Sequence, residues 1–210
     1  MNFGLQTDYP AACNALETLV LHESLLNTVW PAVAQALFEK NVELLCDAPS
    51  LSALQTSTVT KVNPKLLKVA TADSYDTEHL SLTLSVLTVP SLAAAIAHIN
   101  AHSSHHTDTI VTETPASATQ FCRGVDSAGT FVNASTRFAD GFRYGFGTEV
   151  GISTGRIHAR GPVGLEGLVT YKYVMRSQAQ DGHIVGEFGI GAGKKSYKHQ
   201  KLATDKVPFY

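Results

Sequence analysis

The sequence has few cysteines, little excess charge and no apolar run long enough to cross a membrane. Three cysteines at irregular spacing among 210 residues form neither a disulfide framework nor a zinc cluster. Sixteen basic and eighteen acidic residues leave a net charge of −2, which predicts neither a nucleic-acid partner nor binding to an anionic membrane. The most apolar stretch, 82–97, is interrupted by polar residues and a proline, so no bilayer span is expected. We therefore expect a reduced, soluble, cytoplasmic protein.

What the sequence does contain is enough apolar material for one folded domain. Hydrophobic residues make up 44% of the chain, and this share excludes general disorder. A chain of 210 residues fits one domain, or one domain with an arm. The same length is short for a nucleotide-dependent enzyme with two substrates.

Apolar, β-branched runs alternate with helix-forming segments over the first 133 residues. Ser24 or Asn27 is the expected cap of the first helix, and Pro90 with Ser91 opens the second. The expected strands are 16–21, 42–46, 82–89, 109–112 and 130–133, and the expected helices are 30–38, 92–100 and 115–125. This alternation predicts an α/β fold with a mostly parallel sheet.

The composition of the sequence changes after residue 140. Eight glycines recur among aromatic and charged residues over 141–167, which predicts an ordered loop wrapping a site or an interface. Residues 168–174 are strand-like. The segment 176–210 is polar and lysine-bearing, and we interpret it as a C-terminal tail or oligomerisation arm.

Cys13 is the first candidate functional residue. It lies in a turn of small residues after Pro10, where backbone N–H groups would lower the pKa of a thiol and could hold an oxyanion. The alternative for a lone cysteine is a small buried side chain, and we expect that role for Cys46 and Cys122.

Other patterns are weaker. Histidines at 98, 102, 105 and 106 lack a carboxylate or cysteine that would close a metal site, so we expect no metal and a solvated helix end. The glycines of 189–196 and 145–151 do not match a phosphate loop or a dinucleotide fingerprint. The run 135–137, Ser-Thr-Arg, follows a predicted strand and suits a carboxylate or phosphate, or else a surface salt bridge.

Four segments together resemble gamma-glutamyl phosphate reductase, a branch of the aldehyde dehydrogenase superfamily. They are residues 10–19, 106–113, 132–154 and 157–165, and the resemblance runs from Thr7 to about Met175. It implies an aldehyde-dehydrogenase-like catalytic domain over 1–140, a glycine-rich site or interface segment over 141–175, and the C-terminal arm over 176–210.

The resemblance also implies a reaction and its residues. Such enzymes reduce L-glutamyl 5-phosphate with NADPH to L-glutamate 5-semialdehyde and phosphate, in proline biosynthesis. Cys13 would be the nucleophile that forms a thioester. Glu78 would hold the nicotinamide ribose of NADP(H). The residues implied in substrate binding are Asn14, His106, Ser135, Thr136 and Arg137. The implied partners are the substrate, the glutamate 5-kinase that supplies it, and further copies of the chain.

One departure from the family is large. Family members are about twice this length, and the part without a counterpart here is the nucleotide-binding domain that precedes the nucleophile. The resemblance therefore implies a C-terminal catalytic half with little reductase activity by itself. Two alternatives stay open: a folded, oligomerising module without catalysis, and a cysteine–histidine hydrolase that pairs Cys13 with His22 or His158.

Overall fold

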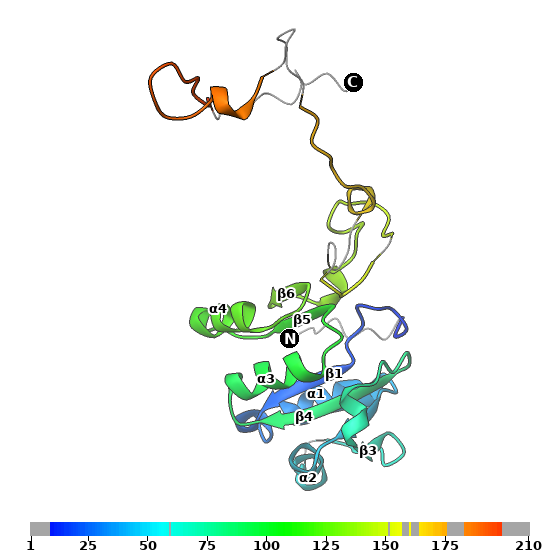
Figure 1. The fold of residues 1–210 in the computed structure, drawn as a ribbon. Helices are drawn as coiled ribbons and strands as arrows, with labels where there is room; N and C mark the ends of the chain where they lie inside the picture. Colours follow the sequence, from blue (N-terminus) through cyan, green and yellow to red (C-terminus); the bar gives the residue numbers. More distant parts are fainter. Residues whose placement is uncertain are drawn as a thin grey trace. The chain divides into compact units, whose positions relative to one another are not determined.

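The computed structural model describes residues 9–58, 60–150, 152–156, 160, 164–175 and 183–198. The chain divides into two compact units, Met1–Val169 and Thr170–Tyr210. Within the described residues, every strand and every α-helix belongs to the first unit (Figure 1). None of the helices in this described part is both long and apolar enough to span a bilayer.

The first unit contains a four-stranded parallel sheet. Its strands lie in the order β1 (Thr18–His22), β4 (Thr83–Val89), β2 (Glu43–Cys46) and β3 (Leu67–Val69). The predicted strands 16–21, 42–46 and 82–89 are confirmed, with their bounds shifted by at most two residues. The α/β class with parallel sheets is confirmed as well. The short edge strand β3 was not predicted.

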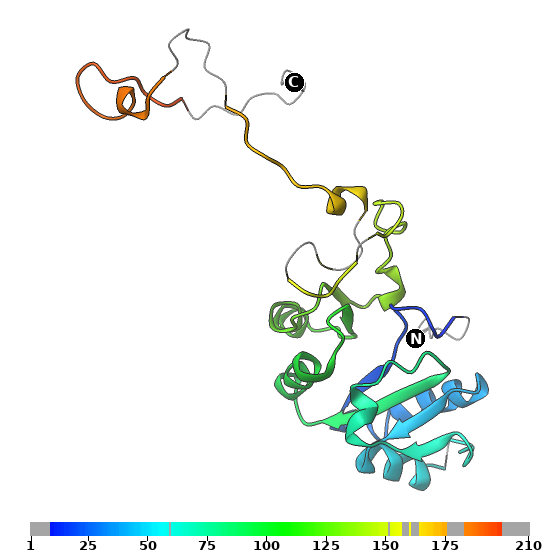
Figure 2. The same cartoon turned by 45° about the vertical axis from the view of Figure 1, so that its right-hand side comes forward.

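Two helices pack apolar residues into the core against this sheet. They are α1 (Trp30–Glu39), as predicted, and α2 (Ala48–Thr56), which lie together against it (Figures 1 and 2). Trp30 has no exposed surface, and its Nε1–H donates to the carbonyl oxygen of Ser50 at 3.0 Å. Leu37, Leu44 and Leu54 are equally buried. Each such leucine contributes about 1.5–3 kcal/mol through burial, so this core stabilises the unit.

The start of α1 differs from the prediction. Ser24 belongs to a 3₁₀ turn, η1 (Glu23–Leu25), and neither it nor Asn27 caps the helix. Val29 precedes α1 without a side-chain cap, and a proline in the first turn removes one of the N–H groups that would need a partner.

Helix α2 is not among the elements predicted from the sequence, because Pro49 suits the end of a strand as well as the first turn of a helix. Asp47 caps the helix by accepting from the backbone N–H of Ser50 at 3.0 Å, and Pro49 lies in its first turn. The same carboxylate accepts from the backbone N–H of Thr88 at 2.6 Å and from its hydroxyl at 3.0 Å. Asp47 thus joins α2 to β4.

A second parallel sheet is formed by β5 (Thr107–Ile110) and β6 (Gly129–Val132). Helix α3 (Leu92–His102) connects β4 of the first sheet to β5, and α4 (Pro115–Gly124) connects β5 to β6. Helix α3 lies between the first sheet and α4 (Figures 1 and 2). These elements confirm the four predicted over 92–133, with bounds that differ by one or two residues. Ser91 caps α3 as expected, accepting from the N–H of Ala94 at 3.1 Å.

The prediction of a strand over residues 168–174 is wrong. Leu165–Leu168 is a 3₁₀ turn, η4, and residues 169–175 carry no strand pairing. Tyr173 is 90% exposed and Met175 is 98% exposed. A strand needs a ladder partner, and no described segment supplies one here.

The second unit is described over residues 170–175 and 183–198. It contains the 3₁₀ turn η5 (Val185–Glu187) and a bridge between Phe188 and Lys195, whose ammonium group lies 2.6 Å from the carboxylate of Glu187. The glycine run rejected as a phosphate loop closes on itself, since the N–H of Gly189 donates to the carbonyl of Lys195 at 3.0 Å. The remainder of the predicted tail lies outside the described residues.

Candidate functional site

Cys13 lies in a turn at the amino-terminal edge of the four-stranded sheet, shortly before β1. The residue is exposed and its thiol is free. Burial raises the pKa of this thiol, and the charges of Glu149 and Glu78 raise it further. Its own backbone N–H and the cation of Arg137 act in the opposite direction. The expected lowering of the pKa by backbone N–H groups is therefore present but outweighed, and Cys13 rests as a thiol at neutral pH.

The other two cysteines differ from Cys13. Cys46 has no exposed surface, as predicted, and burial raises its pKa to about 12. Cys122 is only partly buried, so its predicted place in the core is not what the structure shows.

Asn14 joins Cys13 to the segment that follows β6. Its side chain is 5% exposed, and its Nδ2 donates to the carbonyl of Ala139 at 2.9 Å. Its backbone carbonyl accepts from the hydroxyl of Thr136 at 2.7 Å, and its Oδ1 accepts from the guanidinium of Arg137. Three hydrogen bonds therefore connect the amino-terminal edge of the first sheet to the carboxyl-terminal end of β6.

The predicted anion-binding run forms a 3₁₀ turn, η3 (Thr136–Phe138), which Ser135 caps by accepting from the N–H of Arg137 at 3.3 Å. Thr136 is buried and its hydroxyl is used within the protein. One guanidinium nitrogen of Arg137 donates to the amide oxygen of Asn14. Within the described residues Arg137 forms no ion pair, so the structure does not show the surface salt bridge that was the alternative for this residue.

His106 immediately precedes β5 and is 8% exposed. Its Nδ1 lies 2.9 Å from the hydroxyl of Thr107, and its carbonyl accepts from the N–H of Gly129 at 3.0 Å. Burial lowers the pKa of its imidazole, against the opposing charges of Glu149, Asp108 and Glu78. His106 is therefore a neutral hydrogen-bonding group at neutral pH.

The remaining histidines of this region do not form a metal site. Within the described part of the chain, no three metal-ligating side chains gather. His98 and His102 have ring centroids 4.5 Å apart, and Nδ1 of His102 lies 2.8 Å from the carboxylate of Asp76. The ring of His98 also contacts that of Tyr75 at 5.2 Å, so the expected solvated helix end is partly packed.

Glu78 lies in the loop before β4, at the same edge of the sheet as Cys13. Its side chain is exposed, and its charge raises the pKa of Cys13, Glu17 and His106. Burial, followed by the charge of Glu78, raises the pKa of Glu17 to about 7. An exposed carboxylate that faces this group of side chains suits the hydroxyls of a ribose, so the residues present fit a nicotinamide cofactor at this edge.

Glu149 belongs to this group and was missed by the sequence analysis. Its Oε1 accepts from the backbone N–H of Gly141, and the carbonyl of Gly141 accepts from the N–H of Phe146 at 2.8 Å. A Cβ on Gly141 would lie 2.6 Å from Cγ of Glu149, so only glycine permits this approach. Glu149 is the charge that most raises the pKa of both Cys13 and His106. The available signal was an acidic residue placed among the glycines of 141–167.

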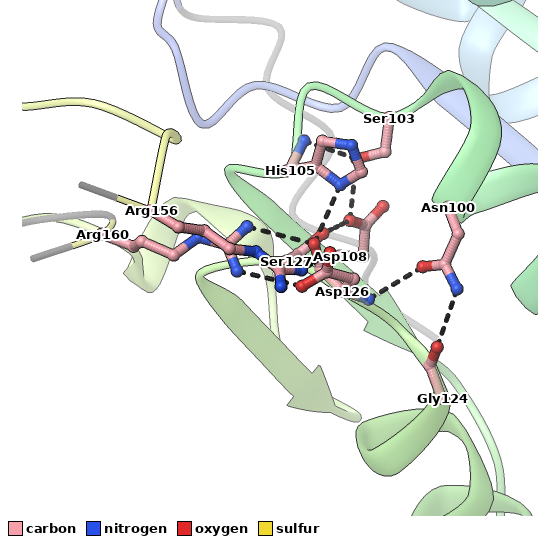
Figure 3. A network of polar contacts seen from close by, with 9 residues as sticks. All are labelled: Asn100, Ser103, His105, Asp108, Gly124, Asp126, Ser127, Arg156 and Arg160. Carbon is pink, nitrogen blue, oxygen red and sulfur yellow. Dashed lines mark hydrogen bonds and ion pairs between the residues drawn. The ribbon is translucent and has the colours of Figure 1, made fainter. Parts of the chain in front are cut away.

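Further along, the glycine-rich segment is fixed by ion pairs rather than by apolar packing. Figure 3 shows Arg156 and Arg160 converging on the carboxylate of Asp126, with Nη1 of Arg160 at 3.0 Å. The backbone N–H of Asp126 donates to Oδ1 of Asn100 at 2.8 Å, which ties the network to α3. These two arginines are paired and serve to order the segment.

Of the two histidines in the hydrolase alternative, one is distant from Cys13. His22 ends β1, whereas Cys13 precedes that strand, so the five residues of β1 separate them by more than about 13 Å of extended chain. Nδ1 of His22 lies 2.8 Å from the hydroxyl of Ser24. His158 lies outside the described residues.

Comparisons with known proteins show which proteins this chain is similar to. No family model matches the chain. A Schizosaccharomyces pombe protein named "Probable gamma-glutamyl phosphate reductase" is 48% identical over 202 residues, which are 96% of this chain and 44% of that protein. The gamma-glutamyl phosphate reductase of Synechococcus elongatus is 53% identical over 195 residues, which are 93% of this chain and 42% of that protein.

Solved structures agree with these sequence relatives. The crystal structure of gamma-glutamyl phosphate reductase from Thermotoga maritima matches with a TM-score of 0.75 and 36% identity, over 84% of this chain and 41% of that one. The enzyme from Saccharomyces cerevisiae matches with a TM-score of 0.51 and 34% identity, over 68% of this chain. The predicted resemblance is thereby confirmed over nearly all of this chain, which spans about two fifths of the length of the relatives that it matches.

Proposed function

We propose that this chain, a homologue of gamma-glutamyl phosphate reductases over nearly its whole length, carries the nucleophile-bearing part of such an enzyme. The reaction is reduction of L-glutamyl 5-phosphate with NADPH to L-glutamate 5-semialdehyde and phosphate, in proline biosynthesis. The observation that supports it most is the convergence of Cys13, Arg137, His106 and two carboxylates on one edge of the fold.

In the first step, the sulfur of Cys13 attacks the acyl carbon of the substrate. The S–C bond forms, the C–O bond to phosphate breaks, and phosphate leaves with the electron pair. The thiol proton passes to solvent or to the departing phosphate. An acyl phosphate is already activated, so a resting thiol beside backbone N–H groups suffices without a base that would also activate water.

The substrate is held by the side chains around the thiol. Arg137 is charged at all physiological pH values and suits a carboxylate or phosphate. Asn14, Ser135 and Thr136 hold the turn that presents Arg137. His106, neutral at the pH of the cell, is a hydrogen-bond partner for the substrate that adds no charge of its own.

Glu78 would bind the ribose of the nicotinamide, and the remainder of NADP(H) would be bound by a domain to which no part of this chain corresponds. When bound, the cofactor supplies the hydride that releases the semialdehyde. We propose little reductase activity for the 210-residue chain alone, a cytoplasmic location, assembly with further copies of the chain, and supply of substrate by a glutamate 5-kinase.

Acylation of Cys13 tests the proposal without the cofactor. The chain is incubated with L-glutamyl 5-phosphate, which glutamate 5-kinase and ATP generate in place, and is analysed by peptide mass spectrometry. We expect a glutamyl group on the peptide containing Cys13, removed by neutral hydroxylamine as a thioester is. Cys122→Ala should keep this adduct and Cys13→Ala should lose it. An unmodified Cys13 in the presence of freshly made substrate would refute the proposal.

A second measurement addresses turnover. The nucleotide-binding part of a homologous reductase is expressed separately and added to this chain, with NADPH oxidation followed by absorbance. Recovery of turnover that depends on Cys13 would support the division of labour proposed here. The alternative of a folded module without catalysis predicts neither acylation nor turnover.

A further inference from the structure

The carboxylate of Glu149 is held in place by Gly141, four residues after Arg137 in the chain. Its Oε1 accepts from the N–H of Gly141, two residues after Ala139, whose carbonyl is bound by Asn14. Arg137 binds Asn14 from the same turn. The residue next to Cys13 is thus connected to a fixed cation and, through Gly141, to a fixed anion.

This pairing of charges matches the chemistry of one class of substrate. An amino-acid acyl phosphate carries an ammonium and a carboxylate on the same carbon atom, whereas an acyl phosphate of a plain dicarboxylic acid carries no cation. The charge of this partly buried carboxylate has a cost, because it raises the pKa of Cys13 and so disfavours the thiolate. A cationic group of the substrate would offset that cost.

We propose that Glu149 is a specificity residue, whose carboxylate binds the α-ammonium group of the amino-acid substrate while Arg137 binds its α-carboxylate. This inference rests on the proposed function and adds to it the residue that binds the α-ammonium group of the substrate. It also gives Glu149 a part in activation: once its charge is neutralised by the ammonium group, the pKa of Cys13 falls towards its ordinary value.

Binding of two inert ligands tests this inference on the 210-residue chain. L-Glutamate carries the α-ammonium group and glutarate lacks it, and both are titrated into the isotopically labelled protein by NMR. We expect the wild type to bind L-glutamate more tightly than glutarate. In Glu149→Gln, which keeps an acceptor for the N–H of Gly141, the affinity for L-glutamate should fall about tenfold and that for glutarate should not fall.

Two further variants guard against an effect on folding. Gly141→Ala leaves the charge of Glu149 in place but displaces its side chain, and it should also lose the preference for L-glutamate. Glu113→Gln removes an exposed carboxylate elsewhere and should keep the wild-type preference. Thermal unfolding confirms that each variant is folded.

The outcomes separate this inference from the proposed function. A preference for L-glutamate that survives in Glu149→Gln overturns the role of Glu149. Equal binding, or no binding, of the two ligands to the wild type, with normal acylation of Cys13, overturns this inference alone. Absence of both ligand binding and acylation overturns the proposed function as well.

Discussion

Substitution of Asn14 should disconnect the nucleophile from the turn that carries Arg137. Asn14→Ala removes the donor to the carbonyl of Ala139, a residue that is 1% exposed, and the acceptor of the guanidinium. Leaving a buried carbonyl without a partner costs about 1–3 kcal/mol, and the partly exposed bond to arginine adds about 1 kcal/mol. The free energy of unfolding should therefore fall by about 2–4 kcal/mol.

Two variants calibrate this value. Thr136→Val conserves shape, keeps the Asn14 side chain and removes only the 2.7 Å bond to the Asn14 carbonyl, so it should cost about 1–2 kcal/mol. Asn63→Ala removes an exposed acceptor of the N–H of Lys65 and should stay within about 0.5 kcal/mol of wild type.

Urea unfolding measures these differences, and the rate at which iodoacetamide alkylates Cys13 reports on the site itself. Because Asn14→Ala loosens the turn that carries the exposed Cys13, the partial burial that raises the pKa of its thiol is reduced and alkylation at pH 7 should accelerate severalfold. If Asn14→Ala matches Asn63→Ala in stability and leaves the alkylation rate of Cys13 unchanged, the connecting role assigned to Asn14 is incorrect.

Three further predictions concern the frame of the site. Trp30→Phe removes the hydrogen bond to the carbonyl of Ser50 and opens a cavity, so urea unfolding should show a loss of about 2–4 kcal/mol, and a loss below 1 kcal/mol would contradict this account. Asp47→Ala removes the cap of α2 and its bonds to Thr88, which should cost about 2–4 kcal/mol, with Asp47→Asn intermediate. Glu17 has a folded pKa of about 7, above its unfolded value, so its contribution to stability is complete at low pH and is lost as the pH rises through about 7. Glu17→Gln should therefore gain about 1–2 kcal/mol relative to wild type at pH 8 but not at pH 4, after allowance for the exposed part of the side chain, and identical pH profiles would refute the assignment.

Apart from β3 and α2, the strands and helices of the first 133 residues could be predicted because their apolar residues follow the spacing of buried elements. Helix α2 was missed because Asp47 and Pro49 were treated as the end of a strand, although the same pair also begins a helix. The prediction of a strand over 168–174 was wrong for a different reason. Its composition favours a strand, but pairing depends on a neighbour that composition cannot supply.

Residues of the candidate site could be predicted only where a short local sequence motif pointed to them. Cys13 and Arg137 were identified from local motifs, and their common surroundings are confirmed by the bonds through Asn14. Asn14 itself was expected to bind substrate, whereas its side chain is occupied by Ala139 and Arg137. The position of the Glu149 carboxylate depends on its hydrogen bond to Gly141, eight residues earlier in the chain. This contact is set by the path of the loop, which the residue types alone do not predict.

The long sequence separation within the site has a consequence for folding. Asn14 and Ala139 are 125 residues apart, whereas Trp30 and Ser50, which fix the core, are 20 residues apart. Closing the longer loop costs on the order of 1.6 kcal/mol more in chain entropy. During refolding, we expect burial of Trp30 to come first and assembly of the Cys13 surroundings to come late. Until that stage the thiol lacks the partial burial and the charge of Glu149 that raise its pKa in the folded chain, so Cys13 is more open to oxidation in the collapsed chain than after assembly.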